Sequence, residues 1–217
     1  MFSKYVNFII IIILSALLGV VLFLSGLQTW LIFTILLLFT FTLNMGYPFY
    51  VIYKSRSLKL IDRYLSNNRS RTIFMYAYSL AHGTDEDIIN SLKKIVKSYP
   101  QAEVQDVYNA NLLVFQKDWK RLIDSSKSMT TTLYRDYYAG IGYIMSSNNE
   151  KASESLSKVR TPWMFHSLKA IMALKQRQED TFYKEAALAT NQAVGMQRYV
   201  LHHMMKRMAE GAFTKEV

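Results

Sequence analysis

The sequence has no cysteine and only three prolines among its 217 residues. The absence of cysteine excludes disulfide bonds, thiolate catalysis, cysteine-ligated zinc and the acylation of lipoproteins. The residues that are abundant instead, among them Ile, Lys, Asn, Ser and Tyr, are typical of an AT-rich bacterial genome. The composition therefore favours a bacterial protein whose fold is held together without disulfide bonds.

Charge is missing from the first quarter of the chain. No charged residue lies between Lys4 and Lys54, and all 16 acidic residues occur from Asp62 onward. This distribution predicts a segment solvated by lipid, followed by a water-soluble domain of roughly 165 residues that can bury a core. The formal net charge is +10, of which Lys4 supplies one, so the chain from Lys54 onward carries +9. Beside a membrane segment, this charge favours the anionic inner leaflet as a neighbour over nucleic acid.

Two apolar runs predict a transmembrane helical hairpin within residues 1–53. The spans cover about residues 6–24 and 30–53, and each is long enough to cross a hydrocarbon core as a helix. The residues between them, 25–29, are uncharged, and Gly26 can turn the chain. A cleaved signal peptide is the alternative for the first run. Its apolar stretch is too long for that, no small-residue cleavage site follows, and a second run comes at once.

Basic residues predict the orientation of this hairpin. Lys4 precedes the first span, the loop has no basic residue, and a cluster follows the second span: Lys54, Arg56, Lys59, Arg63, Arg69 and Arg71. The positive-inside rule then places both termini in the cytoplasm, in a two-span protein of the cell membrane. No ionisable residue lies inside either span, which favours an anchor over a transport function. The Gly46-Tyr47-Pro48 segment predicts a kink or an end in the second helix.

The segment after the spans has helical periodicity throughout. Residues 54–68 predict a basic juxtamembrane helix, in which Leu58, Ile61 and Leu65 share one face. Its basic side chains are the candidate contacts for anionic lipid headgroups: Lys54, Arg56, Lys59 and Arg63. Beyond this helix, polar breaks predict antiparallel helix pairs, and they fall at residues 67–68, 82–84, 99–100, 116–118, 146–149, 161–162 and 178–180. Thr84 and Asp87 resemble a capping box at one of the helix starts.

Residues 69–190 resemble the tetratricopeptide repeat, a helical hairpin of about 34 residues. In that family positions 8 and 20 carry small residues that meet where the two helices cross. A frame that starts at Leu133 fits best, with Gly140 at position 8 and Ala152 at position 20. The other frames give position 8 to Tyr76, Ala110 and Leu174, and position 20 to Ile88, Leu122 and Ala186. Tyr76, Ile88 and Leu122 depart from the pattern by their size, and Pro162 comes two places early. The resemblance implies an all-α solenoid of about four hairpins.

Residues 191–217 predict a C-terminal helix and tail. Val194, Leu201, Met205 and Met208 form one apolar stripe along this helix. A helix that covers the last hairpin is the expected interpretation. The alternative is a methionine-rich face that docks a partner, since methionine adapts to varied surfaces.

In tetratricopeptide proteins the first helix of each hairpin lines a concave surface. The corresponding positions here are mostly apolar, with tyrosine and asparagine between them. The resemblance implies a partner-binding face at these candidate residues: Asn111, Tyr134, Tyr137, Tyr138 and Ile141. Tyrosine suits such a face because it combines apolar area with a hydroxyl that needs a partner. The alternative is that these residues are core, buried by a tightly wound bundle or by the C-terminal helix.

No sequence pattern predicts catalysis, a cofactor or a metal. His202 and His203 precede two methionines, but adjacent helical side chains point about 100° apart and do not converge on one ion. Residues Asp85 to Asp87 are acidic, as the dipole at a helix N-terminus favours. The sequence contains no glycine-rich phosphate loop and no nucleophile paired with a base. We therefore expect a protein that is not an enzyme and needs no cofactor.

These features together predict a membrane-anchored scaffold or adaptor with a cytoplasmic domain that binds a protein partner. Tethering raises the local concentration of the domain, so that weak binding to a membrane-bound partner suffices. The resemblance implies a role in the assembly or regulation of a membrane or cell-envelope complex. An accessory subunit of a membrane transporter, bound through the spans, is the alternative, and a hydrolase regulated at the membrane is a third.

Overall fold

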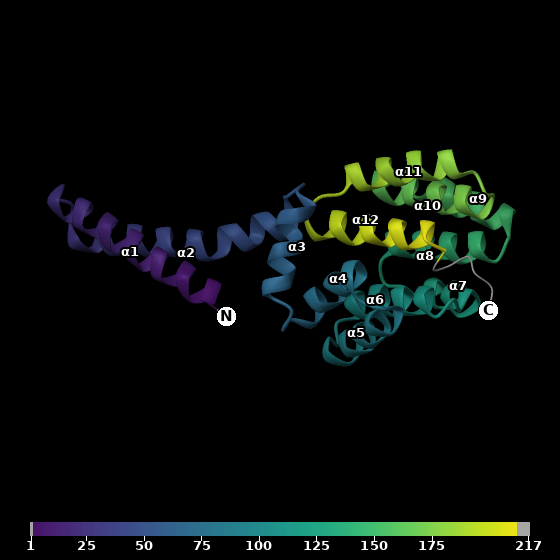
Figure 1. The fold of residues 1–217 in the computed structure, drawn as a ribbon, viewed down its shortest axis with the longest axis horizontal. Helices are drawn as coiled ribbons and strands as arrows, with labels where there is room; N and C mark the ends of the chain where they lie inside the picture. Colours follow the sequence, from purple (N-terminus) through teal and green to yellow (C-terminus); the bar gives the residue numbers. More distant parts are fainter. Residues whose placement is uncertain (1, 212–217) are drawn as a thin grey trace. The chain divides into compact units, whose positions relative to one another are not determined.

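The computed structural model describes residues 2–211, with side chains from Ile9 onward except that of Leu43. The chain divides into two compact units, Met1–Lys54 and Ser55–Val217. Within the described range the regular elements are twelve helices, so the predicted all-α class is confirmed there (Figure 1). The last part of the predicted C-terminal tail, residues 212–217, lies outside the described residues.

The first unit is a hairpin of two helices, α1, Phe2–Leu24, and α2, Thr29–Tyr53. Gly26 makes the turn in the left-handed region, at φ 75°, which glycine adopts without steric cost. Between the helices, the hydroxyls of Ser15 and Thr40 form a hydrogen bond of 3.2 Å. Thr42 donates to the Leu38 carbonyl one turn back, at 2.8 Å. The hairpin therefore satisfies these polar groups internally and turns most of its apolar side chains outward.

Among the described residues, α2 alone is long and apolar enough to cross a membrane. It has 25 residues, whereas the described apolar part of α1, Ile9–Leu24, is shorter. The Gly46-Tyr47-Pro48 segment was expected to kink or to end this helix. The helix does not end there, because it continues through Pro48 to Tyr53. A proline removes one backbone N–H from a helix, and apolar helices tolerate it where neighbouring groups compensate.

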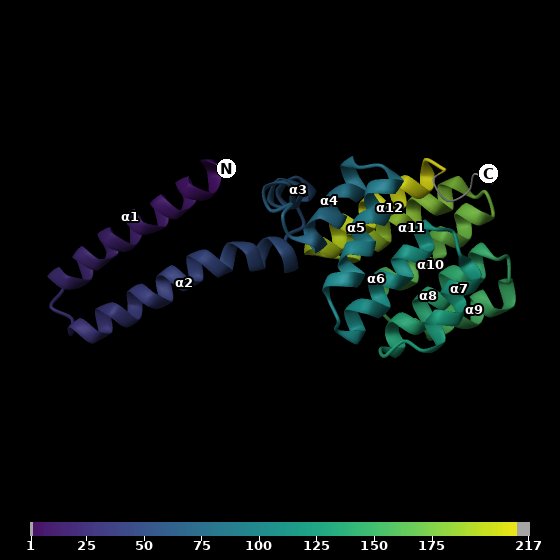
Figure 2. The ribbon, with the colours of Figure 1, turned by 90° about the horizontal axis from the view of Figure 1, so that it is seen from below.

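The second unit begins with α3, Leu58–Asn67, and continues as four helix pairs. These are α4, Thr72–His82, with α5, Asp85–Ser98; α6, Ala102–Phe115, with α7, Trp119–Lys127; α8, Thr132–Met145, with α9, Asn149–Lys158; and α10, Pro162–Lys175, with α11, Glu179–Gln192. A final helix, α12, spans Gly195–Ala209. Figures 1 and 2 show the pairs following one another through the unit, with α12 packed against α3, α4 and α11.

Local sequence explains where several of these helices start. Thr84 and Asp87 form the predicted capping box: the Thr84 hydroxyl accepts from the Asp87 N–H at 3.2 Å, and the Asp87 carboxylate accepts from the Thr84 N–H at 2.9 Å. The side chains of Asp118 and Asn148 cap α7 and α9. Pro162 takes the first position of α10, where its missing N–H is not needed.

Three of the four pairs are joined by the same type of loop. Lys117, Ser147 and Arg177 occupy the left-handed region, at φ 56°, 59° and 60°. The backbone hydrogen bonds around the three residues also follow one pattern. The loops are therefore spaced by 30 residues, which is shorter than the tetratricopeptide unit of about 34 residues.

This spacing moves the register of the last predicted hairpin. It aligns three small residues on the first helices of successive pairs, Ala110, Gly140 and Ala170, and all three are buried. Ala170 therefore occupies the small position that the 34-residue frame gave to Leu174. The four-residue difference between the two periods accounts for this shift.

The contact predicted between Gly140 and Ala152 also differs in the structure. A Cβ placed on Gly140 would lie 3.0 Å from Leu168 Cδ1 and 3.4 Å from Ser155 Cβ. Ser155, and not Ala152, is therefore the residue of α9 that comes nearest to this glycine. Ala152 is buried one turn earlier, so the small residues still lie on the packed face of α9.

The last helix is part of the core of the second unit. Leu201, Met204, Met205 and Met208 are buried in the same apolar cluster as the first helices of the pairs. At the start of the helix, Gly195 has φ 58°, and its N–H donates to the carbonyl of Ser55 at 2.7 Å. The first residue of the unit is thus joined to the start of its last helix by a backbone hydrogen bond.

Arg207 fixes the far end of α12 to the C-terminus of α4. Its Nε donates to the Leu80 carbonyl at 2.7 Å, and its Nη2 donates to the carbonyls of Ser79 and Gly83. Its Nη1 forms an ion pair with Asp85 at 2.8 Å. The last carbonyls of a helix have no partner within the helix and carry partial negative charge. One guanidinium therefore satisfies the end of α4 and holds α12 beside it.

Candidate partner-binding pocket

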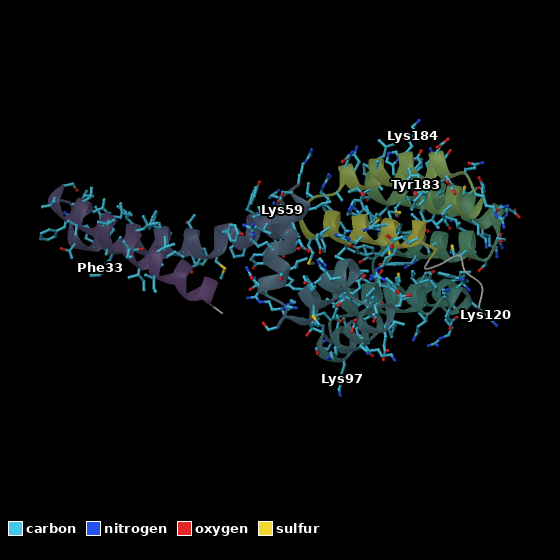
Figure 3. The ribbon with its side chains drawn as sticks, in the orientation of Figure 1. Phe33, Lys59, Lys97, Lys120, Tyr183 and Lys184 are labelled. Carbon is cyan, nitrogen blue, oxygen red and sulfur yellow. The ribbon has the colours of Figure 1, made fainter. Side chains whose placement is uncertain are left out.

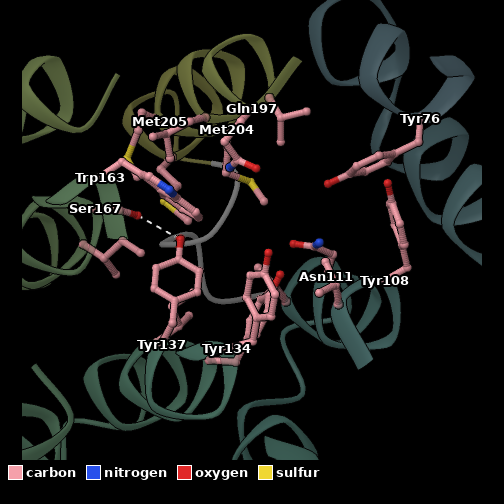
Figure 4. Close-up of a pocket in the computed structure, with 18 of the residues that line it drawn as sticks. Tyr76, Tyr108, Asn111, Tyr134, Tyr137, Trp163, Ser167, Gln197, Met204 and Met205 are labelled. Atoms are coloured by element: carbon pink, nitrogen blue, oxygen red, sulfur yellow. Dashed lines mark hydrogen bonds between the residues drawn. The ribbon is translucent and has the colours of Figure 1, made fainter. Parts of the chain in front are cut away.

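A pocket of about 110 Å³ lies between α12 and the first helices of the four pairs (Figure 4). Its wall on the side of α4, α6, α8 and α10 consists of Tyr76, Val107, Tyr108, Asn111, Val114, Tyr134, Tyr137, Tyr138, Ile141, Trp163, Ser167 and Ile171. Its other wall is formed by α12, through Met196, Gln197, Val200, Leu201, Met204, Met205 and Met208. The concave side of the helix pairs is thus covered by the chain's own last helix, and the pocket is the space that remains.

The floor of the pocket contains a tyrosine that is fixed in place. The hydroxyl of Tyr137 lies 2.9 Å from Ser167 Oγ, in a hydrogen bond between α8 and α10. The Tyr137 ring meets the rings of Tyr138 and Trp163 edge-on, at centroid distances of 5.2 and 5.5 Å. Tyr137 and Tyr138 are only 8% and 4% exposed. These two tyrosines therefore contribute to the core as well as to the pocket.

Tyr76 presents a hydroxyl to the pocket that has no partner among the described residues. The side chain is 2% exposed, and its hydroxyl forms no hydrogen bond. Figure 4 shows this hydroxyl directed toward the space that Asn111 and Tyr108 also face. A buried polar group left without a partner costs about 1–3 kcal/mol. A water molecule or a polar group of a ligand in the pocket would remove that cost.

The pocket carries no ionised group among its lining residues. Burial raises the pKa of Tyr137 to about 12, and the hydrogen bond from Ser167 lowers it only in part. Burial also raises the pKa of Tyr108 to about 12, and Tyr99 and Tyr134 add to that effect. For Tyr76, burial raises the pKa well above its usual value. All three phenols are neutral at physiological pH, so the pocket suits a neutral group with hydrogen-bonding capacity.

The rim of the pocket is where another molecule can reach it. Asn111, Tyr134 and Trp163 are partly exposed, and Gln197 is exposed on α12. Together these side chains offer two amides, a phenol and an indole around the opening (Figure 4). Aromatic side chains with a polar end are enriched at the centres of protein interfaces.

The structure brings all five predicted partner-binding residues to this one pocket: Asn111, Tyr134, Tyr137, Tyr138 and Ile141. Asn111 and Tyr134 are accessible at the rim, whereas Tyr137, Tyr138 and Ile141 are buried. Sequence reasoning missed Tyr76, Trp163 and Gln197. The 30-residue spacing could have found the α10 wall, since it aligns Tyr137 with Ser167 and Ile141 with Ile171.

The four predicted lipid contacts lie elsewhere. Lys54 follows the last residue of α2, and Arg56, Lys59 and Arg63 lie before and along α3. All four side chains are exposed, and Figure 3 shows Lys59 at the surface. None of the four forms an ion pair with another described residue. They are therefore available to anionic groups in solution or at a membrane.

Two of the histidines, His82 and His166, form polar contacts between helices. His82 Nε2 lies 2.7 Å from Asp62 Oδ1, and the hydroxyl of Tyr199 donates to the same carboxylate. His203 packs on the Tyr199 ring at a centroid distance of 4.4 Å. Burial raises the pKa of Asp62, but the hydrogen bonds from Tyr199 and His82 outweigh it and leave the pKa below its usual value. This cluster joins α3, α4 and α12.

His166 is held in a second contact of this kind, between α10 and α11. Its Nδ1 lies 2.6 Å from the carboxylate of Glu185, which Lys169 also approaches, at 3.4 Å. Burial raises the pKa of Glu185, but the hydrogen bond with His166 and the charge of Lys169 together leave it below its usual value. Within the described residues, no group of three or more His, Asp or Glu side chains is arranged to hold a metal ion. Comparison of the chain with protein-family models, with curated proteins and with solved structures found no match.

Proposed function

We propose that this protein is a membrane-anchored scaffold whose second unit binds a protein partner through the tyrosine-lined pocket beside α12. The observation that carries the proposal is the buried, unpartnered hydroxyl of Tyr76 in a neutral pocket with an aromatic rim. A partner that inserts one polar side chain would complete that hydrogen bond. It would also cover Tyr134 and Trp163, which are the residue types that contribute most to interface affinity.

The size of the pocket favours a side chain of a protein over a cofactor or a substrate. Sites for small molecules usually enclose about 300–1,000 Å³, whereas this pocket has about 110 Å³. One inserted side chain fits that space, and the rest of the partner would lie across the rim. A binding role without catalysis is therefore the function that we propose.

The first unit supplies the anchor in this proposal. The length and apolar surface of α2 support a membrane span, and we propose that α1 crosses beside it, with both termini in the cytoplasm. The basic residues after α2 support that orientation. With the second unit on the cytoplasmic side, Lys54, Arg56, Lys59 and Arg63 are proposed contacts for anionic headgroups.

The test is quantitative co-purification of the full chain from its host in mild detergent. Asn111→Ala and Tyr134→Ala should each lower the recovery of one particular protein at least tenfold, because both side chains line the accessible rim. Leu133→Ala is the matched control: it changes an exposed residue of the same helix that does not line the pocket. A protein whose recovery is equal in all three variants does not bind at the pocket. A partner lost only after changes on the exposed face of α2 would favour an accessory subunit of a transporter instead.

Tyr76→Phe separates binding from stability in the same experiment. The change removes a hydroxyl that has no partner in the free protein, so the melting temperature should stay equal or rise. The partner, which would lose its hydrogen bond, should be recovered several-fold less. A drop in the melting temperature would show that the hydroxyl is already satisfied in the free protein.

A further inference from the structure

A second and larger depression lies on the other side of α12, between this helix and α11. It has a volume of about 630 Å³, which is within the range of binding sites for small molecules. It is lined by Leu58 of α3 and by residues along α11 and along α12. We call it the α11–α12 groove.

The floor of the groove is apolar. Phe182, Ala186 and Met205 are buried beneath it, and Leu58 is half-buried at one end. The alanines at 186 and 187 leave open space that larger side chains would fill. Tyr183 of α11, whose side chain is 60% exposed, also lines the groove. This floor suits a hydrocarbon group, because burial of apolar surface stabilises by about 25 cal/mol per Å².

The edge of the groove along α12 carries two cations, Arg198 and Lys206, and one carboxylate, Glu210. Arg198 donates from Nη1 to the Thr190 carbonyl at 2.6 Å and from Nη2 to Asn191 Oδ1 at 3.1 Å, while its Nε has no partner among the described residues. Lys206 lies further along the same helix, and its Nζ is 3.8 Å from Oε1 of Glu210. Burial lowers the pKa of His202, and the positive charges of Lys206 and Arg198 lower it further. The two cations therefore act on the groove together, and the imidazole between them is neutral at physiological pH.

We propose that the α11–α12 groove binds an acyl chain of an anionic membrane lipid, with the lipid's negative group beside Arg198 and Lys206. The chain would lie on Phe182, Ala186 and Met205. A hydrocarbon chain needs no hydrogen bonds, which fits a floor that offers none. An extended peptide would need partners for its backbone, and the polar groups at the end of α11, the Thr190 carbonyl and the Asn191 amide oxygen, already bond Arg198.

This inference rests on the proposed membrane anchorage, and the sequence supplies the link. Leu58 follows Lys54, the first residue after α2, by only four residues. Four residues span at most about 14 Å. A residue of the groove is thus joined by a short connection to the helix that supports a membrane span, so lipid is available at high local concentration.

The test uses the full chain in lipid nanodiscs of neutral phosphatidylcholine. One preparation contains a small share of phosphatidylglycerol with a diazirine at the end of one acyl chain, and the other contains phosphatidylcholine with the same diazirine. After illumination, labelled peptides are identified by mass spectrometry. We expect label on peptides of α11 and α12 as well as on α1 and α2, and several-fold more label in the groove from the anionic lipid.

Two pairs of variants decide the outcome. Ala187→Trp places a large side chain at an exposed groove position and should lower groove labelling at least fivefold, whereas Leu188→Trp, at an exposed neighbour outside the groove, should not. Lys206→Gln should reduce the preference for the anionic lipid, and Lys184→Gln, on the outer face of α11 (Figure 3), should leave it unchanged.

Each other result overturns the inference in a distinguishable way. Label on α1 and α2 without label in the groove would refute the lipid site and leave the membrane anchor intact. Groove label that persists in Ala187→Trp, or that is equal for both lipids, would show that the acyl chain does not lie there or is not selected by charge. No label on α1 and α2 would refute the anchorage, and with it the proposed function and the lipid site.

Discussion

The two units of this chain use similar apolar residues in opposite ways. In the hairpin of α1 and α2, leucines such as Leu37, 71% exposed, point outward. In the second unit, leucines such as Leu65 and Leu168 have no exposed surface. The described apolar side chains of the hairpin therefore lie mostly on its outside, whereas those of the second unit bury one another in a core. Changes inside the second unit should affect stability strongly, and equivalent changes in the hairpin should affect it little.

The largest effect is expected from Arg207→Ala. The change removes the Arg207 hydrogen bonds to the carbonyls of Ser79, Leu80 and Gly83 at the end of α4, of which the Ser79 carbonyl still accepts from the Gly83 N–H, and it removes the ion pair with Asp85. The loss should be about 3 kcal/mol, since hydrogen bonds from a charged group contribute about 1.5–3 kcal/mol and partly buried acceptors lose this donor. Thermal unfolding of the full chain in detergent, followed by circular dichroism, measures it.

The control for that variant is Arg121→Ala. The Arg121 side chain is 74% exposed and lies 3.5 Å from Asp118, the residue that caps the same helix, and such exposed pairs contribute at most about 1 kcal/mol. Equal melting temperatures for the two variants would mean that α12 is not fixed to α4 by Arg207.

A glycine in each unit provides a direct comparison of internal packing. A Cβ on Gly142 of α8 would lie 2.6 Å from Ile123 Cγ1 and 3.3 Å from the Trp119 carbonyl, so Gly142→Ala overpacks the contact between α7 and α8. The expected cost is about 2 kcal/mol, although alanine is the better helix former. A Cβ on Gly46 of α2 meets only Thr42 Cγ2, at 3.8 Å. Gly46→Ala should therefore leave the unfolding temperature unchanged or raise it, and a larger loss there than at Gly142 would contradict the contrast between the units.

The smallest effect on stability is expected from lowering the pH, and it acts through His203. Burial lowers the pKa of His203 to about 4, with His202 and His82 adding to the shift, while an unfolded histidine has a pKa of about 6.5. The unfolded chain thus binds a proton that the folded chain rejects, and stability falls as pH drops from about 6.5 toward 4. Since His203 is partly solvated, screening limits the loss to on the order of 1 kcal/mol.

Chemical unfolding of the full chain at about pH 7 and about pH 5 measures this loss. His203→Gln removes the titrating group and should flatten the difference between the two conditions. An equally steep pH dependence in that variant would assign the effect to other groups.

Sequence reasoning succeeded where a structural feature depends on neighbouring residues. The capping box of Thr84 and Asp87 and the start of α10 at Pro162 both follow from residues within one helical turn, and both are present. The break between α7 and α8 was missed, because the residues from Ser128 to Thr131 include no glycine or proline. That break is stabilised from a distance, by Asp106, whose carboxylate accepts from the Thr130 N–H at 2.7 Å.

The pocket also shows that features set by distant contacts are hard to predict from the sequence. The tyrosines along α8 were predicted to belong to a partner-binding face, and all five residues predicted for that face line the pocket. What the sequence alone left open is that α12 covers that face, because its position is set by distant contacts such as those of Arg207 with α4 and Tyr199 with Asp62. The 34-residue frame also misplaced the last hairpin, since the shared loops recur every 30 residues.

The length of α12 limits how many helix pairs this architecture can hold. Its 15 residues extend about 22 Å, and neighbouring packed helices lie about 8–10 Å apart. With its side chains, α12 can therefore contact the four first helices that line the pocket and not a fifth. Duplication of one 30-residue unit between two of the shared loops would preserve every loop but leave one first helix uncovered. A longer homologue of this fold should accordingly carry a last helix that is longer by about six residues for each added pair.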